Sequence, residues 1–200
     1  MRRMPTSVIA SVGVMLLAGA ACVGVTTPAT PAAQFLDAVA TMCGNAYGGR
    51  ITANEPAAPN DPFEGQALVM HVRTCEGERV LVPFHVGEDR SRTWVLSLHG
   101  DRVRLKHDHR HKDGTEDELT QYGGDSTTPG TATRQEFPVD QFSIDLFTRT
   151  NRAVSNTNTW AMEVHPGRMF AYELSRPGRK FRVEFDLTKT VPLPPAPWGH

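Results

Sequence analysis

The feature that most constrains this chain is an alternation of apolar and polar residues that begins at Ala67. Eight short runs place an apolar residue at every second position through much of the remaining sequence. A period of two sends alternate side chains to opposite faces, which is typical of antiparallel strands with one buried and one solvated face. The apolar positions of the eight runs are Leu68, Met70, Val72; Val80, Val82, Phe84; Trp94, Leu96, Leu98; Val103, Leu105; Phe142, Ile144, Leu146; Trp160, Met162, Val164; Phe170, Tyr172, Leu174; and Phe181, Val183, Phe185, Leu187.

Short turn sequences separate many of these runs. Glu76-Gly77, Gly100-Asp101, Pro166-Gly167 and Pro177-Gly178 supply the residues that tight hairpins favour. Eight strands joined mainly by short turns form an antiparallel meander, and closure into a barrel removes its exposed edges. We therefore predict a mainly β fold, an eight-stranded antiparallel meander closed as a lipocalin-like barrel. A β-sandwich is the alternative, because nothing in the pattern forces closure.

Outside these runs the sequence predicts one short helix, over about 32–43. Thr30 and Pro31 suit a helix cap and first position, and Gly44 suits the end. Between them apolar residues recur at helical spacing: Phe35, Leu36, Val39, Met42 and Cys43. The following stretch, 44–66, is rich in Gly, Asn and Pro and is predicted to be mostly loop.

The C-terminal residues 191–200 form a proline-rich tail. Proline cannot donate to a strand ladder, so we expect extended polyproline-like chain here and no central strand. We expect the tail to lie along its own domain with Trp198 as an anchor. Docking of the tail into a partner's aromatic groove is the alternative.

The N-terminus has the order of features that a secretory signal requires. Arg2 and Arg3 are followed by an uncharged apolar run, 8–20, and then by small residues up to Cys22. The run is shorter than the ~20 apolar residues that span a bilayer. We predict a signal peptide over 1–21, a tether over 22–32 and a single β-rich domain over 33–200. The protein is then periplasmic or anchored at the outer membrane.

Residues 17–22 also resemble a bacterial lipobox, in which Cys22 would be lipidated and tie the protein to the membrane. Gly19 stands where a lipobox usually has an aliphatic residue, and the sequence also fits ordinary A-x-A cleavage. The chain has three cysteines, an odd number in an oxidising compartment. Lipidation of Cys22 would leave Cys43 and Cys75 to form a disulfide. Two buried free thiols are the alternative.

The net charge of the chain limits the classes of partner that it is expected to bind. The formal net charge is −1, which gives no electrostatic reason to expect nucleic acid. The remaining partner classes are the membrane, a small-molecule ligand and an envelope protein.

The segment most suggestive of chemistry is a strand that carries three histidines at alternate positions, His107, His109 and His111. They continue the inward face of Val103 and Leu105. Two histidines at i and i+2 can point at one metal ion such as Zn, with a third ligand needed. Candidates for that ligand are His111, Asp113, Glu116, and also His85 or His165 if the meander brings them to the same rim. The metal-site prediction is therefore His107, His109, His111 and His165.

Three other interpretations of the histidines stay open. They lie exposed at a hairpin tip, they fill a polar barrel mouth by hydrogen bonding, or they act in acid–base catalysis. No partner nucleophile is evident, so no catalytic residue is assigned. The polar segment that follows, 112–136, is placed to act as a lid over this rim, or is a disordered excursion.

Residues 106–114, residues 181–187 and the Pro-Trp-Gly ending resemble a family of uncharacterised exported proteins, lipoproteins among them, of Gram-negative bacteria. The resemblance implies export and supplies no activity or site. The lipocalin-like or calycin-like label rests on strand count and connectivity alone, and the lipocalin Gly-x-Trp signature is missing near the first strand.

Three functions remain from the sequence. The first is a β-barrel binding module of unknown ligand, with inward aromatic residues such as Trp94, Trp160, Phe170 and Tyr172 lining a pocket or simply forming core. The second is a metal-binding protein or metal-dependent enzyme that uses the histidine strand. The third is a structural envelope protein. We expect a non-enzymatic role.

Overall fold

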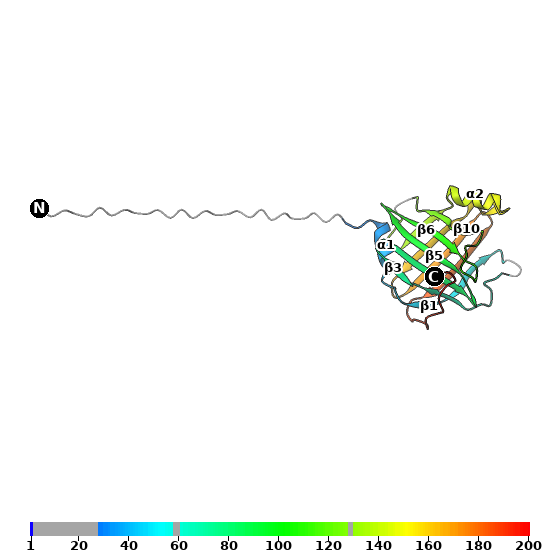
Figure 1. Ribbon diagram of the computed structural model, residues 1–200, viewed down its shortest axis with the longest axis horizontal. Helices are drawn as coiled ribbons and strands as arrows, with labels where there is room; N and C mark the ends of the chain where they lie inside the picture. The colour runs from blue at the N-terminus through cyan, green and yellow to red at the C-terminus, as the bar shows by residue number, and fades with distance from the viewer. Residues whose placement is uncertain (2–27, 58–60, 128–129) are drawn as a thin grey trace.

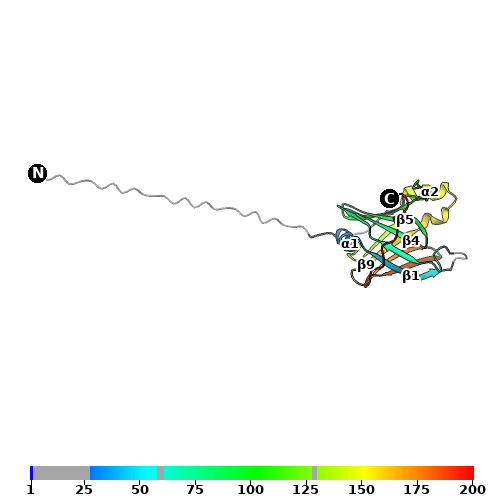
Figure 2. The same ribbon diagram turned by 60° about the horizontal axis from the view of Figure 1, so that its bottom comes forward.

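The computed structural model describes Met1 and residues 28–57, 61–127 and 130–200. Residues 2–21 of the predicted signal, Cys22 and the tether up to residue 27 lie outside the described residues. The fold is mainly antiparallel β with two α-helices, α1 (Pro31–Ala40) and α2 (Gln141–Arg149), and a short 3₁₀ helix, η1 (Ala153–Thr157). Figures 1 and 2 show α1 and α2 well apart on the barrel.

Within the described residues, eleven strands form one sheet. Their order is β7-β6-β5-β4-β2-β1-β11-β10-β9-β8, with β3 paired to β4 off this path. The two outer strands of the order, β7 and β8, lie against each other, so the sheet is a nearly closed barrel. The strands are β1 (Ala46–Glu55), β2 (Leu68–His71), β3 (Thr74–Glu76), β4 (Arg79–Val86), β5 (Asp89–His99), β6 (Arg102–His109), β7 (Tyr122–Asp125), β8 (Arg134–Pro138), β9 (Thr159–His165), β10 (Met169–Arg176) and β11 (Arg179–Asp186).

The predicted mainly β barrel is therefore confirmed, although the described residues form eleven strands and not eight. Seven of the eight alternating runs are strands. Their apolar positions point inward and form one continuous core. Phe84, Trp94, Phe170 and Phe185 pack ring to ring inside it, with centroids 4.8 Å apart for Phe84 and Trp94. Such pairs add stability beyond the area they bury.

The strand prediction is wrong for the fifth run, because Phe142, Ile144 and Leu146 belong to helix α2. Asp140 caps the helix, because its side chain accepts a hydrogen bond from the Ser143 backbone N–H at 2.9 Å. The buried residues of α2 are Ser143, Leu146 and Phe147, which follow helical spacing, while Phe142 is exposed. Three apolar residues at alternate positions fit either period over so short a span.

The prediction of loop over 44–66 is wrong for its first half, which is the central strand β1. This strand pairs with both β2 and β11. It contains Gly48 and Gly49, and a Cβ at Gly49 would lie 2.6 Å from the Phe185 ring. The Phe185 ring fills the core at this point, so β1 carries glycine there and lacks apolar alternation.

The polar stretch 112–136 also contains two strands, β7 and most of β8, and these bring the sheet to closure. The Gly123 carbonyl accepts a hydrogen bond from the Asp140 backbone N–H at 2.9 Å. The Gly123 N–H donates to the Ser143 hydroxyl at 2.8 Å. The start of α2 thus satisfies the backbone N–H and carbonyl of Gly123 where β7 meets β8.

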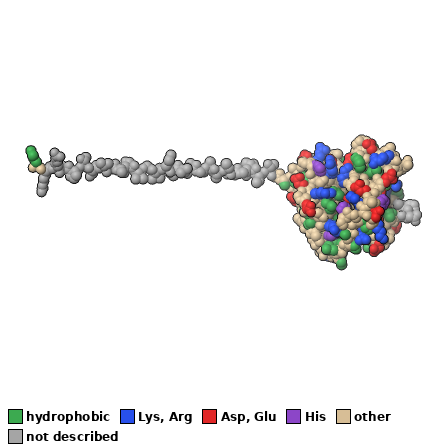
Figure 3. Space-filling view, in the orientation of Figure 1, with side chains coloured by type: hydrophobic (Ala, Val, Ile, Leu, Met, Phe, Trp, Pro, Cys, Tyr) green, Lys and Arg blue, Asp and Glu red, His purple; other side chains and the backbone are tan. Residues whose placement is uncertain are grey.

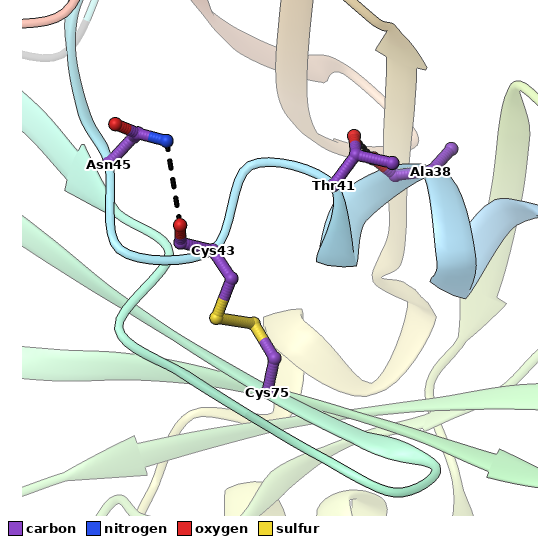
Figure 4. Close-up of a disulfide and its surroundings, with 5 residues drawn as sticks. All are labelled: Ala38, Thr41, Cys43, Asn45 and Cys75. Carbon is purple, nitrogen blue, oxygen red and sulfur yellow. Dashed lines mark hydrogen bonds between the residues drawn. A yellow bond between two sulfur atoms is a disulfide. The ribbon is translucent and has the colours of Figure 1, made fainter.

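Helix α1 closes one end of the barrel. It contacts β4, β5 and β6 on one side and β8 and β9 on the other, and buries Ala32, Phe35, Leu36 and Val39. The predicted Cys43–Cys75 disulfide is present, with Cα atoms 6.3 Å apart, and joins the turn after α1 to β3 (Figure 4). We call this end the plugged end. Strand register places the hairpins at Gly77, Gly100 and Gly167 there too.

The opposite end, which we call the mouth, carries the β10–β11 hairpin at Gly178, the loop after β6 and the segment that holds α2 and η1. The C-terminal tail lies along its own domain, as predicted. The Trp198 backbone N–H donates to the Arg90 carbonyl at 3.0 Å, and the Arg90 side chain donates to the Ala196 carbonyl at 3.1 Å. His200 lies 3.0 Å from the Asp108 carboxylate.

Candidate functional site

A cavity of about 420 Å³ opens at the mouth of the barrel. This volume falls within the usual range for small-molecule sites. Aromatic rings make up much of its wall, together with two leucines, Leu119 and Leu174. The rings belong to Phe63, Tyr122, Phe147, Trp160, Tyr172 and Phe181.

Regular strands aim most of these side chains into the cavity. Alternate residues of β10 share one face, and Tyr172, Leu174 and Arg176 line the cavity in that order toward the mouth. Phe181 and Arg179 do the same from β11. The other lining residues, among them Phe63, Leu119 and Phe147, come from loops and from α2.

His107 lies at the bottom of this arrangement, with 3% of its surface exposed. Its Nδ1 is 3.1 Å from the Tyr122 carbonyl oxygen, and its Nε2 is 2.9 Å from the Tyr172 hydroxyl. A carbonyl only accepts, so Nδ1 carries the proton and Nε2 accepts from Tyr172. The ring also stacks on Tyr122, with centroids 4.5 Å apart.

His109 lines the cavity itself. Its Nε2 is 3.1 Å from the Tyr122 hydroxyl. The two histidines of β6 therefore each bind one tyrosine, and the tyrosines come from strands β7 and β10. Hydrogen bonds satisfy these polar atoms inside an aromatic wall, as buried polar groups require.

Burial keeps this network uncharged near neutral pH. Desolvation lowers the pKa of His107 to about 3 and that of His109 to about 4. Desolvation also raises the pKa of Tyr122 to about 12 and that of Tyr172 well above its ordinary value. The network can donate and accept hydrogen bonds, but at pH 7 neither histidine is tuned to exchange a proton.

Charged groups gather at the rim. Arg152, Arg176 and Arg179 line the cavity, as does Asp117. Arg179 lies 3.8 Å from the Asp61 carboxylate. The side chain of Arg176 donates to the Asn158 side-chain oxygen at 3.3 Å. The rim is therefore more basic than the chain as a whole, where basic and acidic side chains intersperse on the face shown in Figure 3.

The structure does not bring the four predicted metal ligands together. His107 and His109 bind tyrosines, while His111 is exposed and lies 3.8 Å from Asp117. His165 lies 2.7 Å from Glu163. Among the described residues, no group of three or more His, Cys, Asp and Glu side chains is arranged to hold a metal ion. The side chains instead match the alternative of a polar barrel mouth filled by hydrogen bonding.

The expectation that His165 shares a rim with the histidines of β6 is wrong. β9 runs from the mouth to the plugged end, so His165 pairs with Met169 next to the Gly167 turn. The error follows from α2, because counting it as a strand reversed the inferred direction of the next strand. His85 does lie toward the mouth, close to the β4–β5 turn.

Of the four aromatic residues suggested as pocket lining, Trp160 and Tyr172 line the cavity. Trp94 and Phe170 are core, with 1% and 0% of their surface exposed. Sequence reasoning missed the rim arginines. Arg176 continues the inward alternation of Tyr172 and Leu174, and that phase is the signal that points to it.

A second hollow, of about 490 Å³, lies beside β1 and β11, lined by Gly48, Gly49, Phe185 and charged side chains that include Arg50 and Lys189. Its larger volume does not make it the better site. It has a single aromatic lining residue, whereas the mouth cavity joins an aromatic wall to a few placed polar groups.

Comparisons of the chain with models of known protein families, with curated proteins and with solved structures found no significant match. Among the described residues, none of the helices combines the length and the apolar character needed to cross a membrane.

Proposed function

We propose that the protein is a small-molecule binding module that holds an apolar, ring-containing ligand in the mouth cavity. The observation that carries the proposal is the cavity of about 420 Å³ with aromatic walls at the open end of the barrel. Burial of apolar ligand surface against such walls would drive binding.

The contrast between the filled plugged end and the open mouth of the barrel supports this proposal. The plugged end is filled by four buried residues of α1, and the core between the ends is solid with aromatic and aliphatic side chains. A chain that only needed a stable core would gain from filling the mouth as well, because unfilled space forfeits packing energy. The neutral His–Tyr network favours recognition by hydrogen bonding over acid–base catalysis.

The test is a fluorescence titration with the neutral probe N-phenyl-1-naphthylamine. Wild-type protein should enhance probe fluorescence with a saturable curve. The Leu174→Trp substitution fills the cavity from β10 and should weaken binding at least tenfold. Leu193→Trp is the matched control, since Leu193 is exposed in the tail, and should bind the probe as wild type does. Equal binding by wild type and Leu174→Trp would reject the mouth as the site.

We also propose that the protein is exported and lipid-anchored through Cys22, in the periplasm or at the outer membrane. The signal-like order of 1–21 and the lipobox-like residues before Cys22 support this. A disulfide such as Cys43–Cys75 persists in an oxidising compartment. Expression in a Gram-negative host should give a globomycin-sensitive shift in processing. A mature N-terminus at Ala21 or Val23 would contradict lipidation.

A further inference from the structure

Two arginines face each other at the rim of the mouth. Arg176 and Arg179 are direct partners in the β10–β11 register, on either side of the Gly178 turn. Both lie in phase with inward residues of their strands and line the cavity. Like charges directly opposite on neighbouring strands destabilise a sheet, so this placement costs stability in the protein alone.

The surroundings only partly offset that cost. Asp61 lies 3.8 Å from Arg179, but its carboxylate also accepts hydrogen bonds from Asn54 and from the Phe63 backbone N–H. Within the described part of the chain, Arg176 has no carboxylate partner. Burial and the charge of Arg179 both lower the pKa of Arg176.

A third cation, Arg152, lines the same cavity from the segment that joins α2 to η1. Among the described residues that line the cavity, Asp117 is the one carboxylate against these three arginines, so the lining carries excess positive charge. The floor, in contrast, is neutral because its histidines and tyrosines are uncharged at pH 7. The electrostatic asymmetry runs from an uncharged aromatic floor to a basic rim.

We infer that the ligand is an amphipathic anion: an apolar or aromatic body with one acidic group, held by Arg176 and Arg179. The inference rests on the proposed binding function and deepens it. The body lies against Trp160, Tyr172 and Phe181, and the carboxylate, sulfonate or phosphate lies between the two guanidinium groups. Arginine suits this role because its planar donors match such oxyanions. Binding would also relieve the repulsion between the arginines.

Two probes with one skeleton test this directly. N-phenyl-1-naphthylamine is neutral, and 8-anilinonaphthalene-1-sulfonate carries the same rings with a sulfonate. Both are titrated against the full-length protein, wild type and Arg176→Gln. The substitution should weaken binding of the sulfonate about ten- to a hundredfold, the size of one charge-assisted hydrogen bond. It should leave binding of the neutral probe within about twofold.

Two further variants control for folding and charge. Arg176→Lys should keep the charge and retain part of the sulfonate affinity that Arg176→Gln loses. Arg102→Gln removes an exposed arginine beside the Gly100 hairpin at the plugged end and should affect neither probe. Thermal melts of each variant confirm that the comparison is between folded proteins.

The outcomes separate the two proposals. If the neutral probe binds in a Leu174-dependent way but Arg176→Gln weakens both probes equally, or neither, the anion inference falls and the binding function stands. If the binding of neither probe depends on Leu174, the proposed binding function is rejected, and the inference of an anionic ligand is rejected with it.

Discussion

At the scale of single residues, the buried hydrogen bond between His107 and Tyr172 links the floor of the site to the stability of the fold. It joins β6 to β10, which are not neighbours in the sheet order. The bond crosses the barrel interior, where an unpaired polar atom costs most. His107 is therefore a neutral structural acceptor that lies behind the cavity wall, against the lining residues Tyr122 and Tyr172.

Tyr172→Phe should destabilise the protein by about 1–3 kcal/mol, because it leaves the His107 Nε2 buried without a donor. Urea unfolding measures this. Tyr47→Phe is the control, since Tyr47 is similarly buried and, among the described residues, its hydroxyl has no hydrogen-bond partner. Equal losses for the two variants would show that the His107 bond contributes nothing of its own.

Stability should fall as the pH drops from 7 to 5. Desolvation lowers the folded-state pKa of His85 to about 4 and that of His107 to about 3, against an unfolded value of about 6.5. The unfolded chain therefore binds more protons below pH 6.5, and each histidine costs roughly 1–2 kcal/mol by pH 5. Urea unfolding at both pH values should show a smaller loss for His107→Gln. An unchanged pH dependence in that variant would contradict the burial argument.

At the scale of elements, β1 is a central strand whose sequence lacks the apolar alternation typical of strands. Its glycine at position 49 leaves room for the Phe185 ring, which packs against Phe84 and Phe170. The side chain that fills the core at this point thus belongs to β11. Phe185, on the neighbouring strand β11, thus takes the place of the apolar side chain that Gly49 lacks.

Gly49→Ala should destabilise the protein by about 1–3 kcal/mol, because its Cβ would lie 2.6 Å from a ring held by the core. Gly48→Ala is the adjacent control, with its nearest atom at an ordinary 3.6 Å. Thermal unfolding of both variants compares them. A Gly48→Ala loss as large as that of Gly49→Ala would mean that the ring contact is not the cause.

Some of the strands and helices are predictable from the sequence and others are not. Strands with their own apolar alternation, such as β6 and β11, are predictable because local pattern and tertiary burial agree. β1 is not, because its place depends on Phe185, 136 positions away along the chain. The short α2 is ambiguous by period, and its clearest local signal is the Asp140 cap. The site follows the same rule: Tyr172 is suggested by phase, whereas the Arg176–Arg179 pair requires the register.

At the scale of the whole molecule, the barrel has one end built for stability and one for access. Helix α1 fills the plugged end, and the Cys43–Cys75 disulfide fixes the turn that follows it. The mouth is left open between the α2–η1 segment and the β10–β11 hairpin. Stability concentrated at one end allows the other to keep a cavity.

Replacing both cysteines, as Cys43→Ser with Cys75→Ser, should lower the free energy of unfolding by about 2–4 kcal/mol, since the disulfide closes a loop of about 33 residues. Reduction of the wild type should have a similar effect, and the reductant should not change the variant. Urea midpoints with and without reductant measure this. A wild type indifferent to reduction would contradict a stabilising role for the disulfide.

The most direct test of the central claim is a crystal structure of the protein with 8-anilinonaphthalene-1-sulfonate bound. We expect the rings between Trp160, Tyr172 and Phe181, with the sulfonate within hydrogen-bond distance of Arg176 and Arg179. Probe density in the hollow beside Arg50, with the mouth empty, would contradict it.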